Sequence, residues 1–98
     1  MKFVVAQKNG PQGLLLIVTD QEILGQKFEE GKRQLDLSPA FYQGKAMSRE
    51  EVKKLLSQAQ HLHLTGTRAV ALALEEDLIC SKNILWIQGV PHVEVVMG

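Results

Sequence analysis

Three histidines and a single cysteine are the side chains of this sequence best suited to metal chemistry. His61 and His63 are two residues apart, so their imidazoles share one face if that segment is extended. With His92 and Cys80 they could supply a zinc site. No pair has the Cys-x-x-Cys or longer His spacing of a structural zinc motif. The sequence therefore predicts no metal and no cofactor, with solvated histidines and with Cys80 as a buried or half-buried structural thiol.

General acid–base catalysis is the second kind of chemistry that the sequence offers, through His92 and a carboxylate such as Asp20 or Glu22. Both carboxylates have a structural explanation, because Thr19-Asp20-Gln21-Glu22 has the spacing of a capping box at a helix start. His92 ends the segment Gly89-Val90-Pro91-His92, where glycine and proline indicate a hairpin turn. We therefore expect no catalysis, and a small enzyme that uses His92 with Asp20 or Glu22 is the alternative hypothesis.

The polar-aromatic segment Phe41-Tyr42-Gln43-Gly44-Lys45 has no comparable structural explanation. If Phe41 anchors it in the core, Tyr42 points outward in an extended segment, and exposed tyrosines are enriched at interfaces. Arg49 and Lys53 share a face of the following helix and would contact phosphates while the aromatics stack on bases, although acidic residues lie beside them. The expected binding residues are Phe41, Tyr42, Gly44, Lys45, Pro91 and His92.

Length and composition indicate one globular domain over residues 1–98. Of the 98 residues 45% are hydrophobic and 22% charged, which is enough for a core without a disulfide or metal staple. Eleven basic and eleven acidic residues give a formal net charge of zero, which disfavours a dedicated nucleic-acid binder. One cysteine, no signal-peptide pattern and no membrane span predict a cytoplasmic protein.

The pattern of apolar residues predicts an α+β fold, a single two-layer domain with a mixed, largely antiparallel sheet and about three helices in the order ββαβαβαββ. The expected strands cover 3–7, 14–18, 32–37, 61–64, 84–87 and 93–96; the expected helices begin at the capping boxes 19–22 and 48–51 and at residue 67. Helix 67–78 is apolar on nearly every face, so we expect it in the core with Val70 and Leu74 largely buried. The unbroken apolar run 84–87 predicts a strand covered on both faces.

Four motifs span almost the whole chain: Asp20-Gln21-Glu22-Ile23-Leu24-Gly25, Phe41-Tyr42-Gln43-Gly44, Leu64-Thr65-Gly66 and Ile87-Gln88-Gly89-Val90-Pro91-His92. In this order they resemble the domain of unknown function family 424, a group of small archaeal proteins. The resemblance implies an α+β fold and an archaeal cytoplasmic origin. It implies no activity, since the family itself is functionally uncharacterised.

The sequence thus favours a small non-enzymatic binding or adaptor module over a catalyst. The expected partner is a protein or an RNA, and no membrane partner is expected. A role associated with RNA or with translation is one form of this hypothesis, and binding that weakens with salt would identify it.

Overall fold

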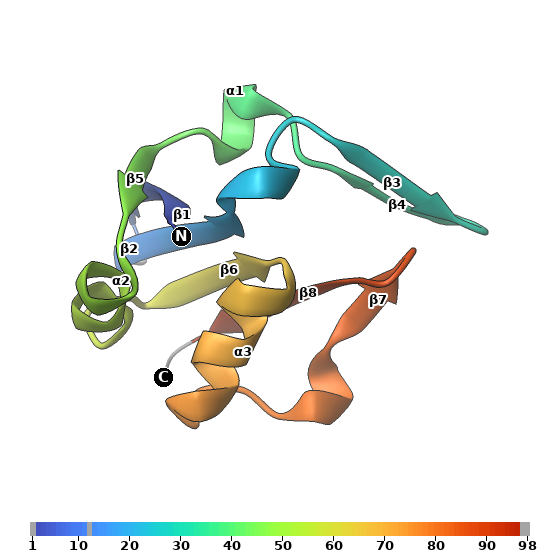
Figure 1. The fold of residues 1–98 in the computed structure, drawn as a ribbon. Helices are drawn as coiled ribbons and strands as arrows, with labels where there is room; N and C mark the ends of the chain where they lie inside the picture. The colour runs from blue at the N-terminus through green and yellow to red at the C-terminus, as the bar shows by residue number, and fades with distance from the viewer. Residues whose placement is uncertain (1, 12, 97–98) are drawn as a thin grey trace.

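The computed structural model describes residues 2–11 and 13–96, which form a six-stranded sheet between two unequal layers (Figure 1). The sheet has the order β5-β1-β2-β6-β8-β7, with β1 (Phe3–Gly10), β2 (Gly13–Asp20), β5 (Lys45–Met47), β6 (His61–Thr65), β7 (Leu85–Ile87) and β8 (Val90–Val96). A separate hairpin consists of β3 (Lys27–Glu30) and β4 (Arg33–Asp36). The helices are α1 (Pro39–Tyr42), α2 (Arg49–Leu56) and α3 (Thr67–Glu75).

Strands β1 and β2 pair as the predicted antiparallel hairpin, in register from Phe3 opposite Asp20 to Gly10 opposite Gly13. Strands β2 and β6 run parallel, and the other neighbours in the large sheet are antiparallel. The predicted fold class is therefore confirmed: the described residues form an α+β structure with a mixed, largely antiparallel sheet and three α-helices.

The two faces of the sheet are covered unequally. Helices α2 and α3 pack on the first face, where Leu16, Leu62 and Val93 belong to the main core. On the second face, α1 and the β3–β4 hairpin cover only a part, around the smaller core of Leu35, Leu37 and Ile87. Figure 1 shows α3 below the sheet and α1 with the β3–β4 hairpin above it. The rest of the second face, which we call the open face, carries Lys8, Leu15, His61, His63, Glu94 and Val96.

Helix α2 begins at the predicted second capping box. The hydroxyl of Ser48 accepts a hydrogen bond from the amide of Glu51, and the carboxylate of Glu51 accepts one from the amide of Ser48. Val52 and Leu56 on the inner side of the helix are buried against the sheet. This part of the prediction is confirmed because all the interactions that start the helix lie within four consecutive residues.

Helix α3 is capped by a residue that lies far away in the sequence. The carboxylate of Asp20 accepts hydrogen bonds from the amides of Arg68 and Ala69, at 2.9 and 2.8 Å. Gly66, with a φ of 109°, precedes the helix, and a Cβ at this position would collide with the Asp20 carboxyl group. Glycine is therefore required here for β2 to deliver its last residue to the start of α3.

The burial pattern of α3 corrects one prediction about the core. Val70 is buried as expected, but Leu74 is 40% exposed. Thr67, Ala71 and Leu74 lie along one side of the helix with i, i+4, i+7 spacing, and all three are exposed. An apolar sequence on every face therefore does not prevent one side of α3 from facing the solvent, and the helix ends at Glu75, earlier than predicted.

The predicted helix after β2 is wrong. The chain makes a single 3₁₀ turn, Gln21–Ile23, and then forms β3. The capping-box spacing at 19–22 does not start a helix because Thr19 is a buried residue of β2 that pairs with Val4 and Thr65, and the carboxylate of Glu22 pairs with Arg68. The amide of Gly25 then donates to the carbonyl of Leu37, and the amide of Leu37 donates to the carbonyl of Gln26, which leads the chain into the β3–β4 hairpin.

The prediction that strand 84–87 is covered on both faces is also wrong. β7 is an edge strand of the large sheet, and Trp86 on it is 50% exposed. Ile87 is buried in the smaller core, while Ile84 and Leu85 are partly buried. A short apolar run therefore marks a strand here but does not place it at the centre of the sheet.

None of the helices in the described residues is long and apolar enough to span a lipid bilayer.

Candidate functional site

Three cross-strand rows of side chains lie on the second face across β1, β2, β6 and β8. The first row joins Lys8, Leu15, His61 and Val96, which are paired neighbours on β1, β2, β6 and β8. The second row joins Ala6, Ile17, His63 and Glu94, and the third joins Val4, Thr19, Thr65 and His92. Because each step between rows is two residues, the strand register brings all three histidines to the same face.

Polar contacts connect the second and third rows. The Nε2 atom of His63 lies 3.3 Å from Oε1 of Glu94, and Nε2 of His92 lies 3.3 Å from the other carboxylate oxygen, Oε2. The Nδ1 atom of His92 is 2.7 Å from the hydroxyl of Thr65. The rings of His61 and His63 are in edge contact, with centroids 4.9 Å apart. Glu94 therefore lies between two imidazoles, and His61 extends the cluster toward the first row.

Both ring nitrogens of His92 have polar partners. An ionised Glu94 can only accept, so Nε2 of His92 is the donor of that contact, and Nδ1 faces the hydroxyl of Thr65 on the other side of the ring. Thr65 is fully buried and His92 is 8% exposed. Both ring nitrogens of His92 are thus engaged within the protein, which suits a residue that orients Glu94 better than one that reacts with a substrate.

Burial and neighbouring charge set the protonation of the cluster. Burial lowers the pKa of His63, aided by the charges of His61 and His92, and this outweighs the opposite effect of Glu94. Burial alone would raise the pKa of Glu94, but the hydrogen bond from His92 and the charges of the three histidines outweigh it and lower the pKa. The site therefore holds an anionic carboxylate beside a neutral His63 near neutral pH.

This cluster contains the residue types that hold a transition metal. One potential ligand atom each from His61, His63 and Glu94 lie within 4.8 Å of one another. Two imidazoles and one carboxylate form the protein ligand set of a class of catalytic zinc sites. Cys80, which the sequence analysis grouped with the histidines, is exposed in the connection between α3 and β7 and is absent from this cluster. The expectation of a buried or half-buried thiol is therefore wrong.

The aromatic segment lies beside the cluster, but its two rings have exchanged the predicted roles. Phe41 is 37% exposed, with the ammonium group of Lys8 4.1 Å from its ring centroid. Tyr42 is half-buried and packs against the smaller core. Its pKa is raised by burial and by the charges of Glu94 and Asp36. The extended segment assumed for the prediction is helix α1, in which neighbouring side chains differ by about 100° rather than pointing to opposite sides.

The other residues predicted for binding, Gly44, Lys45 and Pro91, lie in or beside strands of the sheet. Gly44 passes so close to β1 that a Cβ would collide with the backbone of Val5, so the lack of a side chain is a packing requirement. Lys45 is exposed on β5 at the edge of the sheet. The predicted turn at 89–92 is too long, because β8 begins at Val90 and includes Pro91 and His92. Pro91 is buried in this strand, and its carbonyl accepts from the amide of Gly66. Among the residues predicted for binding, His92 belongs to the histidine cluster, and Phe41 and Tyr42 border it.

The two predicted acids lie away from His92. Asp20 follows Thr19 on β2, so its side chain lies on the first face, where it caps α3, whereas His92 lies on the second face. Burial raises the pKa of Asp20, although the amides of Arg68 and Ala69 act in the opposite direction. Glu22 is exposed and pairs with Arg68. The sheet thus separates Asp20 from His92, and the carboxylate beside His92 is Glu94.

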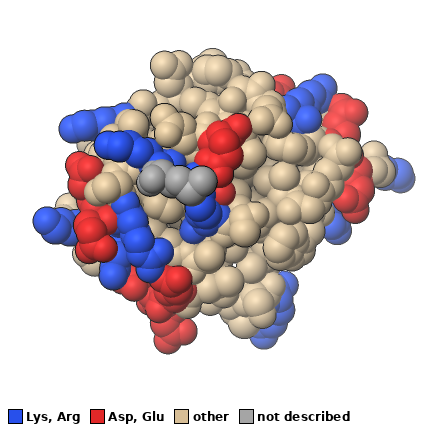
Figure 2. All heavy atoms as spheres, in the orientation of Figure 1, with Lys and Arg blue, Asp and Glu red and all other residues tan. Residues whose placement is uncertain are grey.

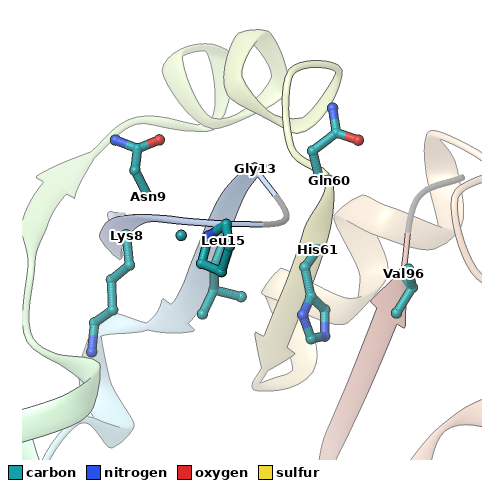
Figure 3. A pocket seen from close by; sticks show the side chains of 9 residues that line it. Lys8, Asn9, Gly13, Leu15, Gln60, His61 and Val96 are labelled. Atoms are coloured by element: carbon teal, nitrogen blue, oxygen red, sulfur yellow. The ribbon is translucent and has the colours of Figure 1, made fainter.

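A surface hollow of about 380 Å³ opens along the first row, beside Gly10, Pro11 and Gly13. Figure 3 shows the side chains of Lys8 and His61 pointing to the same side, with Leu15 between them. Asn9 and Gln60 point the other way, and Val96 lies beyond His61. Hollows of this volume with a few convergent polar groups are typical of small-molecule sites.

Figure 2 shows how the charges are distributed on the face that it presents. Basic and acidic side chains are mixed at the left, over α2, and again at the right, over the β3–β4 hairpin. Among the described residues, Arg49 on α2 pairs with Glu75 on α3, and Lys27 pairs with Glu29 on β3. This mixture differs from the continuous basic surface expected of a nucleic-acid binder.

Sequence reasoning missed Glu94, Thr65 and Lys8 as members of the site. The spacing of His61 and His63 indicates a shared face, but the opposing strand and its register are needed to place Glu94 across from His63. Lys8 lies just beyond the predicted strand 3–7, whereas β1 continues to Gly10 and carries Lys8 into the first row. A strand 90–96 read with period two would have placed His92 and Glu94 on one face.

Comparisons with known proteins identify relatives but no activity. A family model described as "Protein of unknown function (DUF424)" matches residues 8–97. A crystal structure of an uncharacterized conserved protein from Methanopyrus kandleri is similar with a TM-score of 0.75 and 22% sequence identity, covering 100% of this chain and 95% of that chain. At this identity the likeness shows a shared fold. A comparison with curated proteins gives no match.

Proposed function

Because this chain belongs to the DUF424 family, as the sequence motifs predicted, and the description of that family states no function, we propose its function from the geometry. The protein is a non-enzymatic binding module, and it holds a small anionic molecule with an apolar part on the open face of the sheet. The observation that carries this proposal is the hollow in which Lys8 and His61 flank Leu15 (Figure 3).

The lining of the hollow favours this class of ligand. Lys8 supplies a cation and His61 a ring nitrogen, so an anionic group placed between them would gain a charge-assisted hydrogen bond. Leu15, Val96 and Pro11 supply apolar surface beside them. Phe41 lies under the ammonium group of Lys8 and offers a further ring at the border of the open face.

The charge of the open face favours a small anion over an RNA strand. Lys8 is its single lysine or arginine and Glu94 its single carboxylate, within the set of residues that defines this face. An RNA strand needs a series of cations along its backbone as well as stacking rings. The exposed Phe41 supplies one ring on which a base could stack, so the test below includes RNA as the alternative ligand.

The contacts of His92 also favour a binding function over catalysis. Its two ring nitrogens are engaged by Thr65 and Glu94, and the sheet lies between it and Asp20. Such an imidazole lacks the free position that a general base needs for a substrate proton.

We further propose that the protein is archaeal and cytoplasmic. The similar structure from Methanopyrus kandleri and the free thiol of Cys80 support this placement.

Chemical-shift mapping by NMR tests the proposed ligand class. Benzoate is the reference probe, and neutral benzamide, which keeps the ring but lacks the charge, is its matched control. Benzoate should shift the amide signals of Lys8, Gly10, His61 and Val96 in a saturable manner, and benzamide should not. Lys8→Ala should weaken benzoate binding about tenfold, as the loss of one charged hydrogen bond does.

Lys54→Ala is the control variant, because Lys54 is exposed on α2 and lies on the other side of the sheet. It should leave the benzoate titration unchanged. Equal responses to benzoate and benzamide, or shifts that map away from the hollow, would contradict the proposal. If a short single-stranded RNA causes salt-sensitive chemical-shift changes and benzoate causes none, the ligand is RNA and not a small anion.

A further inference from the structure

A second binding function is carried by different atoms of the open face. We propose that His61, His63 and Glu94 bind one divalent ion of the zinc class, with the remaining coordination position open to solvent. The proposal goes beyond the anion-binding function and shares only His61 with it. It rests on three observations: the strand register, the spacing of the ligand atoms and the hydrogen bonds that support the carboxylate.

The register places the ligands on rigid elements. His61 and His63 alternate on β6, and Glu94 is the paired neighbour of His63 on β8. β6 lies inside the sheet, between β2 and β8, so the backbone on both sides of the two histidines is held by strand pairing. Ligands supplied by paired strands are positioned before the ion arrives, which lowers the entropic cost of binding.

The spacing between the ligand atoms of His63 and Glu94 suits a tetrahedral ion. Two atoms bonded to zinc at about 2.0–2.1 Å lie about 3.3–3.4 Å apart when the geometry is tetrahedral. The Nε2 atom of His63 and Oε1 of Glu94 are 3.3 Å apart. The ligand atom of His61 lies within 4.8 Å of the other two, and its side chain lines the hollow; in the proposed complex the ring turns toward the ion.

His92 and Thr65 support the carboxylate from behind. His92 donates from Nε2 to Oε2 of Glu94, which leaves Oε1 for the ion, and the buried hydroxyl of Thr65 holds the opposite side of the imidazole. Metal-binding carboxylates and histidines commonly have hydrogen-bonded supports of this kind. A carboxylate that merely paired with His63 on the surface would need neither contact, so the supporting residues point to a built site.

The ligand types select the class of ion. Two imidazoles and one carboxylate suit zinc and cobalt, whereas magnesium prefers oxygen ligands and keeps most of its waters. The side chain of Glu94 is 55% exposed and that of His63 is 16% exposed, so the ion would lie at the surface with access to water. We therefore expect zinc and cobalt to bind and magnesium not to compete.

Zinc titration of the metal-free protein against a chromophoric chelator tests the proposal. One zinc ion should bind per chain, an excess of magnesium should not displace it, and cobalt in its place should give the visible absorption of a four-coordinate site. Glu94→Gln keeps the shape of the side chain and should weaken zinc binding by at least about tenfold, the loss that a change in a supporting residue alone produces. His63→Ala should abolish the cobalt absorption.

Three controls distinguish this site from zinc bound elsewhere on the protein and from a loss of folding. Glu50→Gln changes an exposed carboxylate on α2 and should leave zinc affinity unchanged. Cys80→Ser should also leave it unchanged, and a thiolate absorption band with cobalt would place the ion at Cys80 and overturn the proposal. Circular dichroism should confirm that Glu94→Gln is folded. Unchanged zinc affinity in a folded Glu94→Gln would likewise overturn it, since the carboxylate would then not be a ligand.

Discussion

Glu94 lies directly across the β6–β8 pairing from His63, with its Oε1 atom 3.3 Å from Nε2 of that imidazole. Its second carboxylate oxygen accepts from His92, whose other nitrogen is held by Thr65. Through His92, the carboxylate of Glu94 thus connects the half-buried ring of His63 on the open face to the buried hydroxyl of Thr65. This connection makes both the stability of the sheet and the properties of the open face sensitive to the same few residues.

Replacing Thr65 by valine should therefore have two consequences. It removes the buried donor to Nδ1 of His92, which should lower the free energy of unfolding by about 1–3 kcal/mol. It should also weaken zinc binding about 10–100-fold, because His92 no longer holds Glu94 in place. Thr67→Val is the matched control at an exposed position and should change neither quantity appreciably. Denaturant melts and zinc titrations measure the two effects, and equal stability of the two variants would contradict the prediction.

The burial pattern of α3 predicts opposite outcomes for two leucines. Leu72 is 1% exposed, so Leu72→Ala should cost about 2–5 kcal/mol through the lost contacts and the cavity that remains. Leu74 is 40% exposed, so Leu74→Ala should cost less than about 1 kcal/mol. Urea denaturation of both variants measures the difference. A larger loss for Leu74 would mean that α3 is rotated about its axis relative to the arrangement described above.

Asp20 should contribute more to stability than its neighbour Glu22. Asp20→Ala leaves the amides of Arg68 and Ala69 without their acceptor and should cost about 1–3 kcal/mol. Glu22→Ala removes one exposed ion pair with Arg68 and should cost less than about 1 kcal/mol. Thermal or urea melts at neutral pH compare the two, and similar losses would show that Asp20 does not cap α3.

The pKa of Asp20 adds a pH dependence with a defined sign. Burial raises the pKa of this carboxyl above its ordinary value of 3.8 in the folded protein. The folded state then binds the proton more tightly than the unfolded state, so the contribution of this group to stability is full below pH 3.8 and falls as the pH rises through the folded-state pKa. Relative to Asp20→Asn, the wild type should therefore lose stability over this range, and a relative gain would contradict the assignment.

Substitutions of Phe41 and Tyr42 should affect different properties, ligand binding for Phe41 and stability for Tyr42. Tyr42 packs in the smaller core, so Tyr42→Ala should destabilise the protein by about 1–3 kcal/mol. Phe41 is 37% exposed beneath Lys8, so Phe41→Ala should cost less than about 1 kcal/mol but weaken benzoate binding. Melts combined with the NMR titration measure both. A folded Phe41→Ala that binds benzoate like the wild type would remove this ring from the binding surface.

Local interactions explain which parts of the fold were predictable from sequence. The capping box at Ser48 works because its donors and acceptors lie within one helical turn. The same spacing at 19–22 fails because Thr19 is paired inside β2 and Glu22 pairs with Arg68, a residue 46 positions away in the sequence. Likewise, the apolar run around Trp86 predicts a strand, but its place at the sheet edge depends on the order of all six strands.

The candidate site shows the same division between local and long-range information. The shared face of His61 and His63 follows from their spacing alone. The contribution of Glu94 depends on the register between β6 and β8, and that of Lys8 depends on the parallel pairing of β2 with β6. The roles of Phe41 and Tyr42 were exchanged because a short helix, capped by Ser38, replaces the extended segment.

A crystal structure from crystals grown with zinc tests most directly whether the open face binds ligands through its histidines. We expect an anomalous scattering peak about 2.0–2.2 Å from one atom each of His61, His63 and Glu94. The contacts of His92 with Glu94 and Thr65 should persist in that structure. A peak at any other position, with the His63–Glu94 contact unchanged, would contradict the assignment of this face as the site of zinc binding.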